Sequence, residues 1–98
     1  MAAIKAPAVP ATLVDDIEGM QGTPGAFEYY VRAGSDAPAG MLYICPCGCG
    51  VMGALAFKPA PSPSWHWDGN RGKPTLNPSV HHVGHWHGWL RDGVWVSC

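Results

Sequence analysis

Short apolar and aromatic runs alternate with turn-forming residues along the chain. Residues 27–33 (FEYYVRA), 41–44 (MLYI) and 51–57 (VMGALAF) are such runs, and Gly, Pro or Ser residues lie close to the ends of each. This pattern is typical of β-strands. Only the segment CPCGCG, residues 45–50, separates the second run from the third. The two runs therefore predict a β-hairpin with its cysteines at the tip.

A second hairpin is predicted at the C-terminal end. Asp92 and Gly93 stand between two apolar and aromatic runs, and this dipeptide favours a two-residue type I′ turn. The turn places His87 directly opposite Cys98. The other pairs in this register are Arg91 with Val94, Leu90 with Trp95, Trp89 with Val96 and Gly88 with Ser97. Because side chains alternate between the faces of a strand, one face carries His85, His87, Trp89, Val96 and Cys98, and the other carries Trp86, Leu90 and Trp95.

The remaining segments are less regular. Residues 65–67 (WHW) predict a brief strand, and residues 12–20 fit either a short strand or one helical turn. Prolines hold residues 74–80 in an extended loop that crosses the sheet. Residues 1–12, mostly Ala and Pro, predict a flexible arm. The fold class is therefore mostly β: residues 13–98 form one small metal-stabilised domain, an antiparallel sheet with a zinc-knuckle-like hairpin and a C-terminal hairpin.

The composition argues against several classes of protein. Thirteen Gly and ten Pro among 98 residues argue against a helical bundle. The net charge of −1 provides no basic surface for nucleic acid. The chain has no run of roughly 18 uncharged apolar residues, the length of a membrane span. We therefore expect a cytoplasmic protein that does not bind a membrane, and the charge disfavours nucleic acid as a partner.

The cysteines and histidines predict a metal site. Cys45, Cys47 and Cys49 are separated by single residues, and the glycines between and after them let the loop turn tightly. Thiolates and imidazoles in a tetrahedral set are typical of zinc, with Zn–S bonds of about 2.3 Å. His87 and Cys98, paired across the hairpin, are further candidate ligands, and His85 is an alternate. We expect one structural Zn²⁺ ion, and which four of these six residues bind it stays open.

The stretch PTLNPSVHHVGHWHGWLRDG, residues 74–93, resembles a signature of small uncharacterised phage and bacterial proteins. Thr75, Leu76, Pro78, Ser79 and Val80 match its "TL-x-PS-[IV]" part, and Trp86, His87, Gly88, Trp89, Leu90, Asp92 and Gly93 match the part around "WHG". The segment CPCGCG is similar to a motif in related domains of unknown function. The resemblance implies a cysteine at the position of Gly84, so one implied ligand is missing. Members often carry the label "ammonia monooxygenase". This chain does not support that label, because it is rich in thiols and has no apolar run long enough to span a membrane.

Three function classes follow. The closed ligand set and the small core favour a non-catalytic zinc-binding β module with no catalytic residues. We expect it to be a phage-encoded accessory or assembly protein that acts through a protein partner or by self-assembly. An alternative is an enzyme, either a small zinc hydrolase or a thiol enzyme that uses Cys98 with His87. The third class, a zinc-ribbon nucleic-acid binder, is disfavoured by the charge.

Overall fold

The computed structural model describes residues 8–97, and within this range the chain forms strands and turns but no helix. This confirms the mostly β fold class. The strands are β1 (Val9–Pro10), β2 (Thr12–Leu13), β3 (Ala26–Val31), β4 (Pro38–Ile44), β5 (Met52–Ala56), β6 (His66–Trp67), β7 (Leu76–Asn77), β8 (Val80–His82), β9 (Trp86–Arg91) and β10 (Val94–Ser97). Among the described residues there is accordingly no helix that could cross a membrane.

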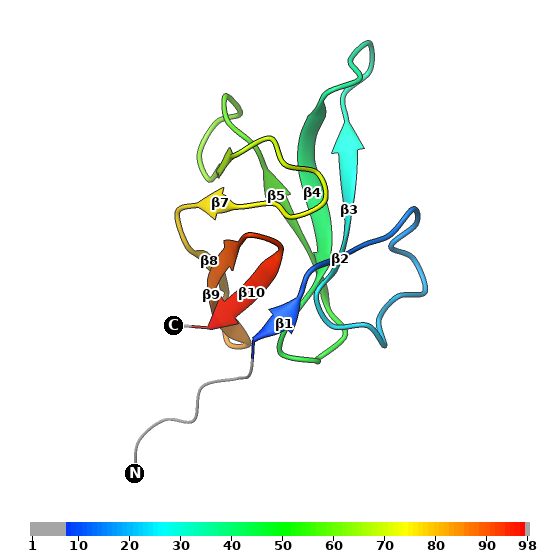
Figure 1. The fold of residues 1–98 in the computed structure, drawn as a ribbon, viewed down its shortest axis with the longest axis vertical. Helices are drawn as coiled ribbons and strands as arrows, with labels where there is room; N and C mark the ends of the chain where they lie inside the picture. The colour runs from blue at the N-terminus through cyan, green and yellow to red at the C-terminus, as the bar shows by residue number, and fades with distance from the viewer. Residues whose placement is uncertain (1–7, 98) are drawn as a thin grey trace.

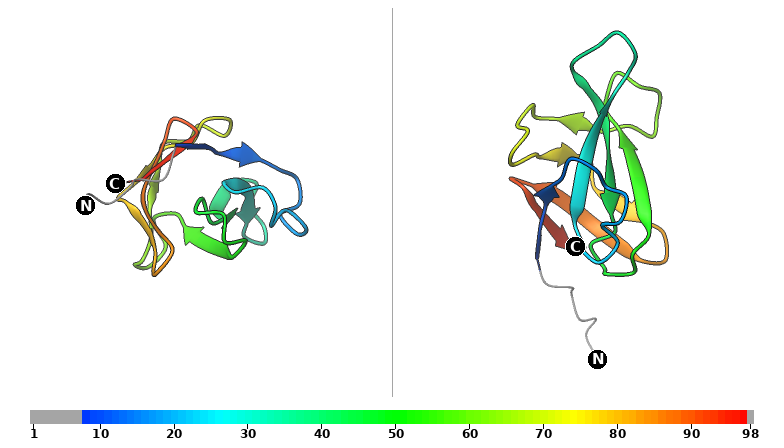
Figure 2. Two further views of the ribbon diagram at one scale, coloured as in Figure 1. Left: turned by 90° about the horizontal axis from the view of Figure 1, so that it is seen from below. Right: turned by 90° about the vertical axis from the view of Figure 1, so that its right-hand side faces the viewer.

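Two four-stranded sheets make up most of the fold. Sheet A has the strand order β1-β10-β9-β8 and is antiparallel throughout. Sheet B has the order β2-β3-β4-β5 and is antiparallel except where β2 runs parallel to β3. Strands β6 and β7 form a separate antiparallel pair. Figures 1 and 2 show sheet A (orange to red, with blue β1) beside the long strands of sheet B (cyan to green).

Both predicted hairpins are confirmed. Strands β4 and β5 pair antiparallel on either side of the cysteine loop. In the β9–β10 hairpin, Leu90 pairs with Trp95 and Trp89 with Val96, as the turn predicts. Asp92 and Gly93 both have positive φ angles, 48° and 75°, which the type I′ turn requires. The predicted partner of His87, Cys98, lies outside the described residues.

Two other segments are more ordered than the sequence predicts. Residues 74–80 contain β7, which pairs with β6, and end at the start of β8, which pairs with β9. Pro74 and Pro78 lie outside the paired positions, so the missing N–H groups of these prolines cost no ladder hydrogen bond. Val9–Pro10, inside the predicted arm, pairs with β10 as β1. Residues 1–7 of that arm lie outside the described residues.

Trp95 is the largest fully buried side chain, and it lies between the two sheets. Its indole packs against Tyr43 of β4, with ring centroids 5.2 Å apart, and against the edge of Trp86 at 5.7 Å. Its Nε1–H donates a 3.0 Å hydrogen bond to the carbonyl oxygen of Gly25, just before β3. Trp95 therefore joins sheet A to sheet B by packing and by a hydrogen bond.

Substitution of Trp95 should destabilise the protein strongly. We expect Trp95→Ala to lower the free energy of unfolding by about 3–5 kcal/mol, because it leaves a cavity in the core. Trp95→Phe keeps a ring but removes one of the two N–H donors to the Gly25 carbonyl, since the Thr12 N–H remains, so a smaller loss is expected. Trp89→Phe, on the exposed face of the same sheet, is the matched control. Urea denaturation followed by circular dichroism measures each change, and equal midpoints for Trp95→Phe and Trp89→Phe would contradict the assignment.

Candidate active site and metal centre

The outer face of sheet A carries a serine and a histidine in contact. Val80 is buried at the start of β8, so the residues on either side of it, Ser79 and His81, point away from the core. On β9, Trp86 and Gly88 are buried and His87 points outward in the same way. The His87 Nε2 atom lies 3.1 Å from the Ser79 Oγ atom, which is hydrogen-bonding distance.

Neighbouring groups hold this pair in place. The Trp65 Nε1–H donates a 3.1 Å hydrogen bond to the carbonyl oxygen of Ser79. His81 is the direct cross-strand partner of His87, and the two imidazole rings lie 4.7 Å apart at an angle of 34°. Val80, with 1% of its surface exposed, anchors the strand that follows Ser79 in the core. The backbone of Ser79 and the ring plane of His87 are thus both constrained.

A serine hydroxyl within hydrogen-bond reach of a histidine is the arrangement that activates serine as a nucleophile. The neutral imidazole accepts the hydroxyl proton as the oxygen attacks an electrophilic carbon, and later returns it to the leaving group. The contact between Ser79 and His87 is therefore a candidate catalytic dyad. It lies on an open sheet face, because His87 is exposed and Ser79 is half-buried.

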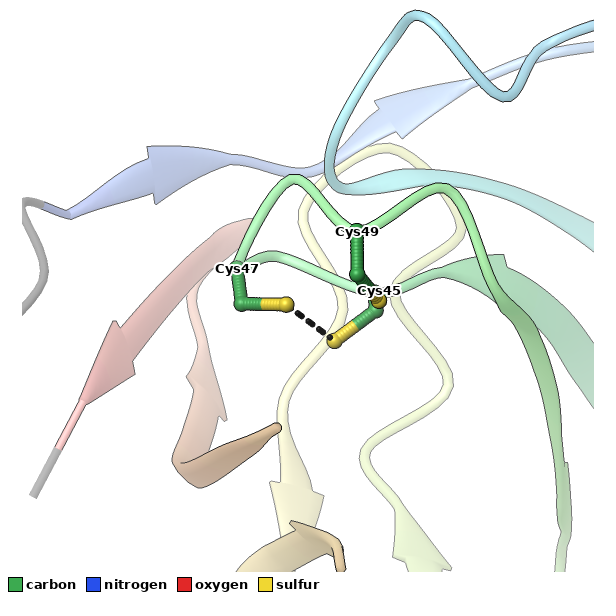
Figure 3. Close-up of side chains that lie close together, drawn as sticks. All are labelled: Cys45, Cys47 and Cys49. Atoms are coloured by element: carbon green, nitrogen blue, oxygen red, sulfur yellow. Dashed lines mark hydrogen bonds between the residues drawn. The ribbon is translucent and has the colours of Figure 1, made fainter. Parts of the chain in front are cut away.

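The second candidate site is the loop between β4 and β5. The ligand atoms of Cys45, Cys47 and Cys49 all lie within 4.8 Å of one another, and these thiols could hold a metal ion. Figure 3 shows the three side chains converging across the loop, with a 3.3 Å contact from Cys45 Sγ to Cys47 Sγ. Gly48 and Gly50 have φ angles of 90° and 81°, which allow the tight turn that brings alternate cysteines together.

The three thiols have different surroundings. Cys45 is buried in the main core, whereas Cys47 and Cys49 are exposed. Burial raises the pKa of Cys45 to about 12. A hydrogen bond from the Val51 backbone N–H favours the Cys49 thiolate and lowers its pKa. The loop thus holds one protonated, buried thiol beside an exposed thiol that ionises more readily.

The predicted metal ligands are only partly brought together. The close group contains Cys45, Cys47 and Cys49 but neither predicted histidine. His87 is instead in contact with Ser79, and His85 lies in the β8–β9 turn with its ring 4.9 Å from that of His82. Cys98 lies outside the described residues.

Ser79 is a candidate functional residue that the sequence pattern did not identify. It stands in the "TL-x-PS-[IV]" motif, so a signal was present, but the prolines around it indicated a loop. Once Val80–His82 is paired with β9, alternation alone places Ser79 on the face of His87. The predicted thiol-enzyme alternative included His87 but paired it with Cys98.

A comparison with known families bears on whether the protein is an enzyme or a non-catalytic zinc module. A family model described as "Bacterial ubiquitination-like system serine protease (BubE)" matches residues 14–98. The chain belongs to this BubE family. No curated protein and no solved structure matches it. The match covers both the cysteine loop and the strands that carry Ser79 and His87.

The BubE match corrects one expectation. A non-catalytic zinc module with a purely accessory role conflicts with membership in a family described as serine proteases. That expectation rests on the closed ligand set and the small core, and it gives no role to the contact between Ser79 and His87. The family description overturns it. The match confirms that the chain resembles a bacterial family. The predicted link to phage proteins stays a prediction.

The surroundings of the thiols predict their order of reaction. In reduced, chelator-treated protein, iodoacetamide should modify Cys49 before Cys45, because Cys49 is exposed and its pKa is lowered, whereas Cys45 is buried and its pKa is raised. Mass spectrometry of timed digests measures the order. Protein unfolded in guanidinium is the control, in which the two cysteines should react at similar rates. Faster modification of Cys45 in the folded protein would refute the description of the loop.

Proposed function

We propose that this BubE-family protein is a serine peptidase in which Ser79 is the nucleophile and His87 the general base. The observation that carries the proposal is the 3.1 Å contact between Ser79 Oγ and His87 Nε2 on the outer face of sheet A. The family description supplies the reaction class, hydrolysis by a serine protease within a bacterial ubiquitination-like system.

The reaction would proceed in two stages. His87 Nε2 removes the hydroxyl proton of Ser79 while Oγ attacks the carbonyl carbon of the scissile bond. The imidazolium then protonates the leaving amine as the C–N bond breaks, which leaves an acyl ester on Ser79. In the second stage His87 removes a proton from water, the resulting hydroxide attacks the ester, and Ser79 recovers its proton as the acid product leaves.

The packing around the dyad supports precise positioning. The hydrogen bond from Trp65 to the Ser79 carbonyl holds the backbone of the nucleophile, and the His81 ring restricts rotation of His87. A displacement of about 1 Å from a productive geometry can cost about 100-fold in rate. We therefore assign Trp65 and His81 as positioning residues.

Apolar and cationic side chains lie beside the dyad on sheet A. Trp89 follows His87 on the same face of β9, and the Arg91 guanidinium lies 4.8 Å from the centroid of the Trp89 ring. Val96, paired with Trp89 on β10, is 37% exposed. We propose that these apolar and cationic groups contact the substrate chain next to the bond that Ser79 attacks.

Loss of either member of the dyad should abolish turnover. We expect Ser79→Ala and His87→Gln to reduce hydrolysis of a fluorogenic peptide library by at least about a thousandfold, because the nucleophile and its base act as a unit. Ser62→Ala and His66→Gln change exposed residues of the same types and are the matched controls.

Labelling with a fluorophosphonate probe tests the nucleophile directly. The wild-type protein and both controls should carry the probe on Ser79, and the two dyad variants should not react. Unchanged labelling of Ser79→Ala, or turnover by His87→Gln at the wild-type rate, would refute the proposal.

We further propose that the ion held by the three thiols is Zn²⁺ with a structural role. Tetrahedral zinc with bonds of about 2.3 Å to sulfur places bound sulfurs about 3.8 Å apart. The thiols of Cys45, Cys47 and Cys49, all within 4.8 Å of one another, need only small movements to reach that spacing. Soft thiolates also disfavour calcium and magnesium. When bound, the ion would tie together a loop that a small core stabilises weakly.

Metal analysis tests this proposal and separates the two sites. Protein purified without added metal should contain one zinc ion per chain, and Cys47→Ser should lower both zinc content and thermal stability. His87→Gln should keep its zinc, because the structure places His87 against Ser79 and outside the thiol group. Wild-type protein without zinc would refute the metal proposal and leave the catalytic one standing.

A further inference from the structure

One buried nitrogen in the described chain has no partner. This nitrogen is the Nδ1 atom of His82, at the end of β8. Among residues 8–97, it is the buried side-chain polar atom that makes no hydrogen bond. An unsatisfied buried polar group costs about 1–3 kcal/mol, so such an atom in a folded protein calls for a specific explanation. The cost points to a ligand that the polypeptide itself does not supply.

His82 lies on the inner face of sheet A, against a tyrosine of the strand that leads into the thiol loop. Alternation along β8 turns Val80 and His82 inward and His81 outward. The ring of His82 meets the edge of the Tyr43 ring, with centroids 6.2 Å apart. Tyr43 and Cys45 are two residues apart on the β4 side of the loop, and both belong to the buried cluster that contains Val80. Tyr43 thus contacts His82 and shares a buried cluster with Cys45, the first cysteine of the loop.

We infer that His82 supplies the fourth ligand of the thiol metal site. The inference rests on the proposed zinc ion: three thiolates leave one tetrahedral position, and structural sites of three cysteines and one histidine are closed. His82 is outside the group of ligand atoms within 4.8 Å, so ligation requires its side chain to turn from Tyr43 towards the loop. Binding through Nδ1 would satisfy the buried nitrogen.

Ligation by His82 would couple the metal to the catalytic strand. Ser79 immediately precedes β8 and His82 ends it, whereas the thiols belong to the β4–β5 loop of sheet B. The ion would then clamp the strand that positions the nucleophile onto the other sheet. His85, whose ring lies 4.9 Å from that of His82, is exposed in the turn and is the competing ligand that the experiment must exclude.

Zinc affinity and cobalt spectra test the assignment. His82→Gln should weaken zinc binding, measured by competition with a chromophoric chelator, by at least about tenfold, since the loss of outer-shell partners alone costs about 10–100-fold. Cobalt-substituted His82→Gln should keep its sulfur charge-transfer absorption but shift its visible ligand-field bands. His81→Gln, on the opposite face of the same strand, and His85→Gln are the matched controls and should keep the wild-type zinc affinity and cobalt spectrum.

A second measurement does not depend on the folding of a variant. X-ray absorption at the zinc edge of the wild-type protein should show three sulfur scatterers and one imidazole. Four sulfurs, a solvent oxygen in place of imidazole, or weakened binding in His85→Gln alone would overturn the assignment of His82 while leaving the zinc proposal intact. Wild-type protein that binds no zinc would overturn both.

Discussion

The packing of Trp95 between the two sheets is the interaction on which the other features depend. Its indole fills the space between β10 and β4, and its N–H satisfies the carbonyl of Gly25 on the path into β3. A side chain at Gly25 would collide with the Pro10 carbonyl and with Val9, so glycine at this point lets β1 cross above the indole. Because one large ring and one glycine join the sheets, a small chain obtains a defined core with few residues.

This packing also decides which side chains face solvent. On β9, Trp86 and Leu90 are buried in the core with Trp95. The residue between Trp86 and Gly88 must therefore point outward. That residue is His87. The same alternation on β8 buries Val80 and exposes His81. The dyad is therefore a consequence of core packing on its own two strands, and no separate loop is needed to build it.

Local sequence signals predicted the hairpins but not the dyad. Asp92 and Gly93 fix the β9–β10 register through turn geometry, and the cysteine spacing with its glycines identifies the thiol group; both signals act within about ten residues. Ser79 depends on pairing across the β8–β9 turn, and the flanking Pro78 argued against any strand there. The hairpin register, which places His87 opposite Cys98, makes that histidine a candidate metal ligand. In the structure His87 contacts Ser79 and is outside the group formed by Cys45, Cys47 and Cys49.

Strand β8 links the candidate catalytic dyad to the proposed metal site of the thiol loop. Its three residues alternate inward, outward and inward, with the proposed nucleophile, Ser79, at the position before them. A slip of one residue against β9 would turn every side chain to the other face. Ser79 would then point into the core and His82 to solvent, so both the dyad and any contact with the thiol loop would be lost together. The burial of Val80 and the pairing of His81 with His87 oppose that slip, which makes the register of one short edge strand the condition for both sites.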